Sequence, residues 1–309
     1  MSQVAIILAT YNGEKYIQEQ IESIINNSYT KYTIYVCDDG STDKTPSIVN
    51  GLKDKYKDKI VFNANDINRG GLANFLYWTS QIEADYYMFC DQDDVWYENK
   101  IQVSLDFIKS VEKGNSDVPV TIFGDANVVD ERLDLLHESF FKNENLDASK
   151  CSFKDLLMEN KLLGCTVMFN RRTQELLRAV DKLPENIRMH DWWIGLIAST
   201  FGKVAYYNQP LLMYRQHGNN QVGANGYIEY IMKNIFNWKE QRAQLYAIFS
   251  QGESFLNCYR DLLTDDQIEY LEEFSSFYKR GWISRKIRFI KNGYRKTGIM
   301  RNLGMWLVV

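Results

Sequence analysis

The sequence predicts an α/β fold of the Rossmann-like kind, with a mainly parallel sheet flanked by helices and a helical C-terminal extension. In the first half of the chain, short apolar runs alternate with amphipathic stretches, and a polar motif follows each of four such runs. Strands separated by helices imply right-handed crossovers and parallel pairing, with ligands bound at the carboxyl ends of the strands. The composition, 45% hydrophobic and 25% charged, is that of a globular chain.

Predicted strands and helices alternate along the first half of the chain. Apolar runs predict strands over residues 4–8, 33–37, 60–63 and 86–90. Isoleucines at helical spacing, at positions 17, 21, 24 and 25, predict a helix between the first two strands, and a second helix should end near Lys57. The second half is less regular, with expected strands over 121–123 and 165–169, up to two more within 204–214, a helix from His190 to about Thr200, and successive helices from about 226 to 296.

Length and cysteine content limit the organisation. The 309 residues suit one α/β domain, predicted over 1–225, followed by an extension over 226–309. The five cysteines are scattered and form no C-x-x-C pair, so neither a disulfide framework nor a zinc site is expected, and a reducing cytoplasm fits best. No signal peptide and no bilayer-spanning segment are predicted.

The charge is distributed unevenly although the net charge is only −4. All 40 acidic residues lie at or before Glu273, whereas nine of the 36 Lys and Arg residues lie between Lys279 and Arg301. From Trp282, apolar residues 283, 287, 290 and 294 define one face of a predicted basic amphipathic helix. Such a helix can lie on an anionic membrane, or it can pack on the acidic globule or on a second subunit. No nucleic-acid partner is predicted.

The motif that says most about chemistry follows the strand over 86–90, where three carboxylates occur within four residues: Asp91, Asp93 and Asp94, with Gln92 between. Mg²⁺ and Mn²⁺ prefer oxygen ligands, and one or two carboxylates can hold such an ion while phosphate and water complete its shell. The cluster therefore suggests a ligand that carries phosphate. A plain acidic turn is the alternative, since Asp is common in turns.

Polar loops also follow the first three strands. Thr10-Tyr11-Asn12-Gly13 follows the first, the run from Asp38 to Asp43 the second, and Asn68-Arg69-Gly70-Gly71 the third. The paired Asp38 and Asp39 can accept bonds from a base or a ribose, and Arg69 can reach a diphosphate through its fork of donors. A helix cap is the alternative for Ser41, Thr42 and Asp43, but it does not explain the paired Asp38 and Asp39. A solvated loop charge is the alternative for Arg69.

Two further motifs lie in the second half. His190-Asp191-Trp192-Trp193 opens a predicted helix, where Asp191 is either a cap or a base. Adjacent indoles point about 100° apart on a helix, so one of Trp192 and Trp193 is expected to form a platform for a sugar. In the run from Tyr214 to Asn220, His217 could bind a metal or phosphate and Arg215 could neutralise a leaving group, although a lone histidine is more often structural.

Taken together and in this order, these motifs resemble those of family 2 glycosyltransferases with the GT-A fold, particularly bacterial rhamnosyltransferases of surface polysaccharide assembly. The resemblance spans residues 4 to about 220, and its rhamnosyl part rests on Asp91-Gln92-Asp93-Asp94-Val95-Trp96 and the His190-Asp191-Trp192-Trp193 run. It implies a metal-dependent, inverting transfer of a sugar, L-rhamnose from dTDP-β-L-rhamnose, to a lipid-linked saccharide. The enzyme would then work in the cytoplasm at the inner face of the plasma membrane.

The resemblance also implies roles for individual residues. Asp39 would bond the pyrimidine, Asp91 would approach the ribose, and Arg69 would lie by the diphosphate. Asp93, with Asp94 as a second contact, would bind the cation, and Asp191 would be the catalytic base. The remaining nucleotide-sugar contacts would come from Thr10, Tyr11, Asn12, Glu14, Asp38 and Gln92, and the acceptor contacts from His190, Trp192 and Trp193.

Other functions stay open at this point. A UDP-hexose donor would leave the enzyme class unchanged, since spacing does not report the shape of the sugar pocket. A sugar-1-phosphate nucleotidyltransferase would need a Gly-rich G-x-G-T-R loop after the first strand, where Ala9-Thr10-Tyr11-Asn12-Gly13 stands instead. A non-catalytic nucleotide-sugar-binding or scaffold protein would keep Asp39 and Asp93 without needing Asp191.

Overall fold

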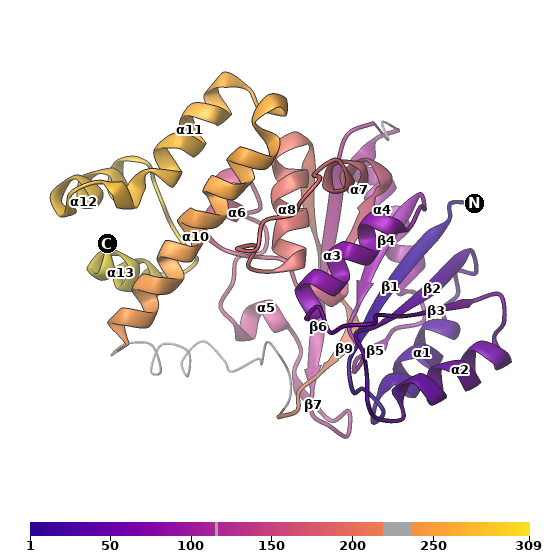
Figure 1. Ribbon diagram of the computed structural model, residues 1–309. Coiled ribbons are helices and arrows are strands. Elements are labelled where there is room, and N and C mark those ends of the chain that lie inside the picture. The colour runs from indigo at the N-terminus through magenta and orange to yellow at the C-terminus, as the bar shows by residue number, and fades with distance from the viewer. Residues whose placement is uncertain (115–116, 219–236) are drawn as a thin grey trace.

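The computed structural model describes residues 1–114, 117–218 and 237–309. Its first half alternates strands and helices as predicted (Figure 1). These elements are β1 (Val4–Thr10), α1 (Ile17–Ile25), β2 (Tyr32–Asp38), α2 (Thr45–Lys55), β3 (Ile60–Ala64), α3 (Gly71–Gln81), β4 (Tyr86–Cys90), β5 (Val95–Trp96) and α4 (Lys100–Glu112).

The middle of the chain is made of shorter elements. They are β6 (Val120–Val129), β7 (Leu135–His137), α5 (Phe140–Asn143), α6 (Phe153–Met158), the 3-10 turn η1 (Gly164–Thr166), β8 (Met168–Asn170), α7 (Arg171–Arg178), α8 (His190–Phe201) and β9 (Lys203–Arg215). Two predictions need correction here. The segment expected to be one strand over 165–169 begins in a 3-10 turn, and only its end belongs to a strand, β8. The segment 204–214 holds one long strand rather than two.

The strands described form a nine-stranded sheet in the order β3-β2-β1-β4-β8-β6-β9-β5, with β7 paired to β6. The first four strands are parallel, as predicted. The other half is mixed, because β8 enters antiparallel between β4 and β6 while β6 and β9 run parallel. Parallel pairing places the last residues of β1, β2, β3 and β4 at one edge of the sheet, and the polar loops therefore start there.

The sheet is held by apolar strands and by helices packed on it. All five residues of β4 are buried, and Val4 to Leu8 of β1 are at most 1% exposed, which is typical of parallel strands covered on both faces. Helices α3, α7 and α8 pack against one another. Helix α8 also contacts α6, and α6 contacts the C-terminal helix α10 (Trp238–Tyr259).

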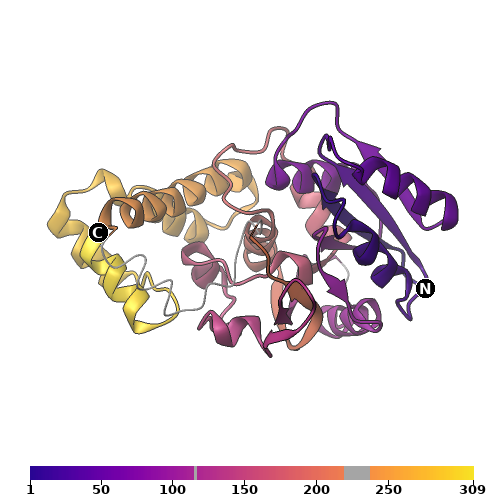
Figure 2. The same ribbon diagram turned by 90° about the horizontal axis from the view of Figure 1, so that it is seen from below.

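The C-terminal helices lie at the end of the molecule away from the parallel strands, so the two termini are at opposite ends (Figures 1 and 2). After α10 come η2 (Arg260–Leu262), α11 (Asp265–Ser275), η3 (Phe277–Lys279), α12 (Trp282–Lys291) and α13 (Ile299–Val308). The successive helices that were predicted are thus present from Trp238 onward. The predicted boundary near residue 225 lies outside the described residues. None of the helices described is both long and apolar enough to cross a bilayer.

Candidate active site

The loops that follow β1 and β4 are tied together at the carboxyl edge of the sheet. The Gln92 side-chain oxygen accepts hydrogen bonds from the Thr10 hydroxyl at 2.7 Å and from the Tyr11 backbone N–H at 2.9 Å. A Cβ on Gly13 would lie 2.4 Å from the same oxygen, so only glycine permits this approach. Gln92 therefore orders the loop after β1, while the Tyr11 side chain stays 48% exposed at the surface.

Asn12 and Glu14 connect the loop after β1 to the loop after β2. The Asn12 N–H donates to the Ser41 hydroxyl at 2.8 Å, and the Asn12 side-chain oxygen accepts from the Thr42 N–H at 2.9 Å. A carboxylate oxygen of Glu14 accepts from the Lys44 N–H at 2.9 Å. Both side chains thus fix the relative position of two loops that would flank a bound nucleotide.

The neighbouring carboxylates Asp38 and Asp39 are each 2% exposed but have different partners. Asp38 accepts from the backbone N–H and the hydroxyl of Ser41. It therefore caps its own turn, and its contact with a nucleotide stays a prediction. Asp39 accepts from the Arg69 and Gly70 N–H groups, each at 2.8 Å, and from the Asn65 amide.

Asp39 consequently holds the loop after β3 against the end of β2. Gly40 and Gly70, with φ of 82° and 79°, allow the backbone to turn on either side of this contact. The Arg69 guanidinium lies 4.1 Å from the centre of the Tyr77 ring and remains at the surface. Its five N–H donors are therefore near the surface, next to the loop after β3.

The acidic motif after β4 divides into a buried and a more open part. Ligand atoms of Asp91, Asp94 and Cys165 lie within 4.8 Å of one another. One Asp94 oxygen accepts from the Arg215 N–H at 3.2 Å, and the other is buried without a hydrogen-bond donor among the described residues. Burial, together with the charges of Asp93 and Asp191, raises the pKa of Asp91 to about 7. Burial also holds the pKa of Asp94 well above its usual range, reinforced by the charges of Asp93 and Asp91.

A buried lysine compensates this concentration of carboxylates. Lys100 is fully buried, and its ammonium donates to the Cys165 carbonyl at 2.6 Å and lies 3.4 Å from the centre of the Trp96 ring. Burial lowers its pKa to about 8, against the attraction of Asp94 and Asp91. Burial also keeps the Cys165 thiol protonated by raising its pKa. A protonated thiol is a poor ligand for a hard cation, so Asp91, Asp94 and Cys165 together fit Mg²⁺ or Mn²⁺ poorly.

Asp93 lies on the more open side and forms a pair with His217. The His217 Nε2 atom is 2.8 Å from an Asp93 oxygen, and the two side chains are 9% and 14% exposed. The imidazole stacks on Tyr16, with ring centres 5.1 Å apart. A carboxylate oxygen and an imidazole nitrogen at a partly open position form a donor pair that fits a divalent cation.

Arg215 differs from its prediction. Its side chain is 3% exposed, and its guanidinium donates to the Asp93 carbonyl at 2.8 Å, to the Glu131 carbonyl at 2.7 Å and to the Glu19 carboxylate. The prediction that this side chain reaches a phosphate is therefore wrong. Arg215 instead holds the end of β9 against the acidic motif and so positions His217.

Asp191 is a buried carboxylate in the first turn of α8, 2% exposed. One oxygen accepts from the Asn160 amide at 3.1 Å and from the Trp192 N–H at 2.7 Å. Burial raises the pKa of Asp191 to about 6, and the bonds from Asn160 and from backbone N–H groups limit that rise. A carboxylate with a pKa near the working pH is suited to take up a proton.

His190 lies next to Asp191 and is neutral, because burial lowers its pKa to about 3. Its ring stacks on Phe75, with centres 4.0 Å apart, and its Nε2 atom is buried without a hydrogen-bond partner among the described residues. A Cβ on Gly164 would lie 3.0 Å from that nitrogen, so glycine keeps the space beside His190 and Asp191 open.

Trp192 and Trp193 are both buried, at 5% and 0% exposed. The Trp192 indole donates to the Leu156 carbonyl of α6, and the Trp193 ring packs on Phe255 and Tyr259 of α10. The expectation that one indole forms an exposed platform for a sugar is therefore wrong. Helix α8 is buried on more than one side, because α10 covers the face opposite the sheet.

Sequence reasoning missed Lys100, Asn160 and Gly164. Lys100 begins α4 and looks like an ordinary helix-start lysine, so only its burial reveals its contact with the acidic motif. Asn160 stands outside any motif, 31 residues before the carboxylate that it contacts. No local signal in the sequence identifies either residue.

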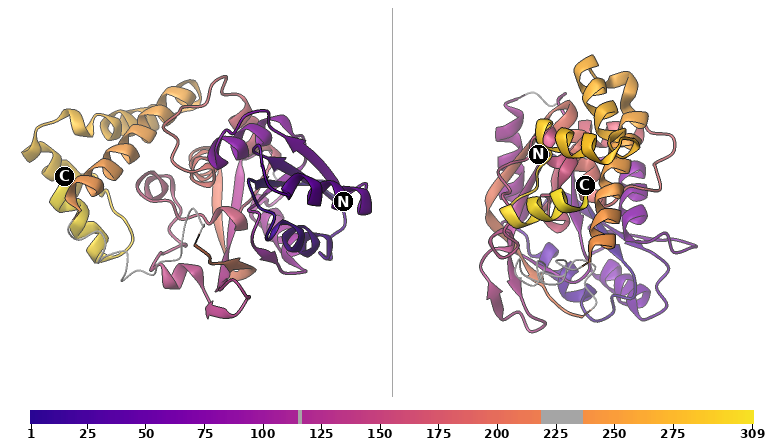
Figure 3. Two further views of the ribbon diagram at one scale, coloured as in Figure 1. Left: turned by 60° about the horizontal axis from the view of Figure 1, so that its bottom comes forward. Right: turned by 90° about the vertical axis from the view of Figure 1, so that its left-hand side faces the viewer.

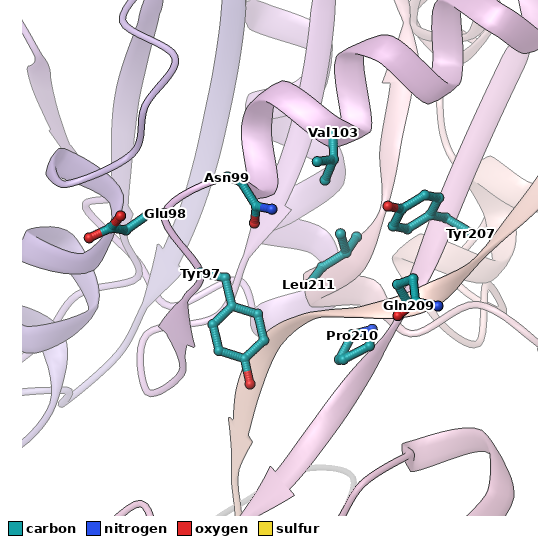
Figure 4. A pocket seen from close by; sticks show the side chains of 8 residues that line it. All are labelled: Tyr97, Glu98, Asn99, Val103, Tyr207, Gln209, Pro210 and Leu211. Carbon is teal, nitrogen blue, oxygen red and sulfur yellow. The ribbon is translucent and has the colours of Figure 1, made fainter.

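A cavity of about 620 Å³ lies between the β5–α4 connection and the middle of β9 (Figure 4). Figure 4 shows the side chains that line it: Tyr97, Glu98, Asn99, Val103, Tyr207, Gln209, Pro210 and Leu211. None of the residues singled out from the sequence is among them, so this cavity is distinct from the cluster of Asp91, Asp93 and Asp191.

Comparisons with known proteins agree with the geometry. The family described as glycosyl transferase family 2 matches residues 5–160. The dTDP-rhamnosyl transferase RfbG of Shigella flexneri is 31% identical over 228 residues, which cover 71% of this chain and 74% of that protein. The match extends past the family region and into the segment that carries Asp191.

Solved structures share the fold. The S. aureus TarS 1-349 structure in complex with UDP-GlcNAc superposes with a TM-score of 0.58 and 17% identity, covering 99% of this chain and 90% of that one. A mannosyltransferase from Pyrobaculum calidifontis in complex with GDP-Man and Mn²⁺ gives a TM-score of 0.56 and 15% identity, covering 99% and 84%. In a longer TarS chain the match, with a TM-score of 0.54 and 19% identity, spans 93% of this chain but only 45% of that one.

Proposed function

Because this chain belongs to glycosyltransferase family 2, we propose that it transfers L-rhamnose from dTDP-β-L-rhamnose to a lipid-linked saccharide with inversion at the anomeric carbon. One observation carries the proposal: Asp191, at the start of α8, lies near Asp91 of the acidic motif that follows β4. Asp191 is close enough that its charge raises the pKa of Asp91. A base is thereby set beside a candidate cation site, as displacement of a diphosphate requires.

The proposed chemistry is a single displacement. As the acceptor oxygen attacks the anomeric carbon, Asp191 takes the proton of that hydroxyl, and the bond from the anomeric carbon to the diphosphate oxygen breaks. The nucleoside diphosphate leaves with the bonding electrons. Asn160 holds the Asp191 carboxylate in place, and the bond to Asn160 keeps it ionised near neutral pH.

Asp93 and His217 are proposed to hold a divalent cation, Mg²⁺ or Mn²⁺, with Asp91 close by. When bound there, the cation would offset the charge that develops on the departing diphosphate. Asp94 shares the buried cluster with Asp91. The hydrogen bond from the Arg215 backbone N–H holds its carboxylate in that buried position. We therefore assign Asp94 to holding the motif in shape rather than to the cation itself.

The nucleotide is proposed to lie between the loops after β1, β2 and β3. Thr10, Tyr11 and Gln92 form one wall, and Asn12 and Glu14 fix it to the next loop. Asp39 is proposed to face the pyrimidine, Asp91 the ribose and Arg69 the diphosphate. His190 is proposed to face the acceptor with its unpartnered Nε2 atom.

A UDP-hexose donor is the second candidate. The support for it is that the S. aureus TarS structures, which share this fold, hold UDP and UDP-GlcNAc. The rhamnosyl donor rests on the 31% identity with a dTDP-rhamnosyl transferase. The proposed catalytic residues are the same for both donors, so the two proposals differ only in the pocket that would bind the sugar.

The donor is tested by calorimetric titration of the protein with dTDP-β-L-rhamnose, UDP-glucose, UDP-galactose and UDP-GlcNAc, each with Mn²⁺ and with EDTA. We expect the dTDP-sugar to bind in the presence of Mn²⁺ at least about tenfold more tightly than the UDP-sugars, or about 1.4 kcal/mol. Preference for a UDP-sugar would contradict the rhamnosyl assignment, and no binding of any of them would favour a scaffold function.

We further propose that the enzyme acts in surface polysaccharide synthesis, in the cytoplasm at the inner face of the plasma membrane. A lipid-linked acceptor would be presented there, and the cysteines described are all free thiols. The nine Lys and Arg residues between Lys279 and Arg301 support this proposal, because cationic side chains are attracted to anionic lipids.

A further inference from the structure

Helix α12 exposes an apolar face at the end of the molecule. Trp282, Ile283, Ile287 and Ile290 are between 60% and 67% exposed, and their spacing places them on one arc of the helix. Phe289, at 6%, packs inward. Tyr294, predicted to extend the same face, is instead buried in the aromatic cluster of α10 and α11, at 1% exposed.

Helix α13 exposes a second apolar face. Its outward residues are Ile299, Met300, Leu303, Trp306 and Leu307, each between 41% and 85% exposed, whereas Met305 is buried. Large apolar side chains at this level of exposure normally occur singly on a soluble protein. Here they recur along two consecutive helices.

The two faces are continuous, because Lys286 joins them. Its ammonium donates to the Trp306 carbonyl and lies 4.2 Å from the centre of the Trp306 ring and 5.8 Å from that of Trp282. One indole from each helix therefore flanks the same lysine. Figure 3 shows α12 and α13 side by side in both views, at the end of the molecule farthest from the parallel strands. We call the nine exposed apolar side chains of α12 and α13 the two-helix surface.

The charge around the two-helix surface is of one sign. Residues 274–309 contain no Asp or Glu. Arg280 and Arg288 are paired with Glu273, but Lys291 and Arg295 are exposed, and no carboxylate among the described residues pairs with them. Lys286 also points along the surface with the indoles. The surface is thus apolar with basic residues among and around it.

We propose that the two-helix surface docks on an anionic lipid bilayer, with α12 and α13 lying in the plane of the membrane interface. Tryptophan prefers the headgroup level, isoleucine and leucine reach the acyl chains, and Lys and Arg pair with lipid phosphates. A second copy of the chain is a poor occupant, since a two-fold contact would bring the same basic residues together without any acidic partner.

This inference deepens the proposed function, since it names the partner at which a lipid-linked acceptor would be met. Its physical basis does not depend on the donor. The two can therefore fail separately: nucleotide-sugar binding reports the active site, and vesicle binding reports the two-helix surface.

The test is co-sedimentation of the full chain with phosphatidylcholine vesicles and with vesicles that contain about one third phosphatidylglycerol. The variant is Ile283→Glu, Ile287→Glu and Leu303→Glu together. The matched control is Leu135→Glu, Leu136→Glu and Leu262→Glu, which changes three leucines that are 57%, 51% and 55% exposed elsewhere. It adds the same charge.

We expect the parent chain to bind the anionic vesicles at least about tenfold more tightly than the neutral ones, as electrostatic attraction requires. The surface variant should lose about tenfold or more of that affinity, while the control stays within about threefold. Calorimetric donor binding should be equal in all three chains. Equal vesicle binding by variant and control would overturn the proposal. The proposal would also be overturned if the parent chain did not bind anionic vesicles but formed a dimer, measured by sedimentation velocity, and the surface variant did not form that dimer.

Discussion

Replacing Asp191 by Asn is expected to reduce turnover by roughly 10² to 10⁴ while leaving donor affinity within a few-fold of the parent. The amide keeps the size of the carboxylate and can still accept the Trp192 N–H, so α8 should start as before. What it loses is the ability to take up the proton of the acceptor. The loss should therefore appear in kcat and not in the binding of the nucleotide sugar, measured by calorimetry.

The pH dependence of turnover provides a second readout of the same residue. Asp191 must be ionised to act as base, and its pKa is raised to about 6, so turnover of the parent should fall as the pH drops through about 6. The Asn160 bond lowers that pKa; Asn160→Ala should therefore move the acid limb to higher pH. Turnover of Asp191→Asn within a few-fold of the parent, or an unmoved acid limb in Asn160→Ala, would contradict the role of Asp191.

Replacing Asp93 by Asn is expected to remove most of the metal-dependent part of donor affinity, about a hundredfold or more. A metal ligand should matter at least as much as the residues that orient ligands, which contribute about 10- to 100-fold. His217→Ala should have a similar effect, because His217 contacts Asp93 directly at 2.8 Å. The measurement is donor titration at several Mn²⁺ concentrations, with donor binding in EDTA as the baseline.

The controls for Asp93 separate the two parts of the acidic motif. Asp106→Asn, an exposed site on α4, should behave as the parent does. Asp94→Asn should alter stability more than Mn²⁺ affinity, because Asp94 is buried and bonded to the β9 backbone. If Asp94→Asn lost the metal dependence while Asp93→Asn kept it, the cation would belong to the buried cluster with Asp91 and Cys165.

The parallel half of the fold and the place of the acidic motif could be predicted because both depend on local patterns. Apolar runs of strand length mark β1 to β4, and parallel pairing then brings the loops at Thr10, Asp39 and Asp91 to one edge. The mixed half could not be predicted in the same way. Strand β8 has three residues, and its antiparallel place between β4 and β6 is set by tertiary packing.

The failures at Trp192, Trp193 and Arg215 have one physical cause. Each side chain is buried by a segment that is distant in sequence: α6 and α10 cover the two indoles, and Glu19, Asp93 and Glu131 surround the guanidinium. Spacing along a helix predicts which side chains point in different directions from the helix axis. It does not predict how many faces of the helix are buried by other parts of the chain. For the same reason Lys100 and Asn160 could not be recognised as parts of the site.

Inversion at the anomeric carbon can be read from the configuration of the sugar that is released when water replaces the acceptor. Proton NMR would follow hydrolysis of the preferred donor with Mn²⁺, at times before the free anomers equilibrate. Direct displacement with Asp191 as base predicts an inverted product, α-L-rhamnose from dTDP-β-L-rhamnose, or a β-hexose from a UDP-α-hexose. A product that retains the configuration of the donor would mean a covalent or front-face route, and would contradict the role given to Asp191.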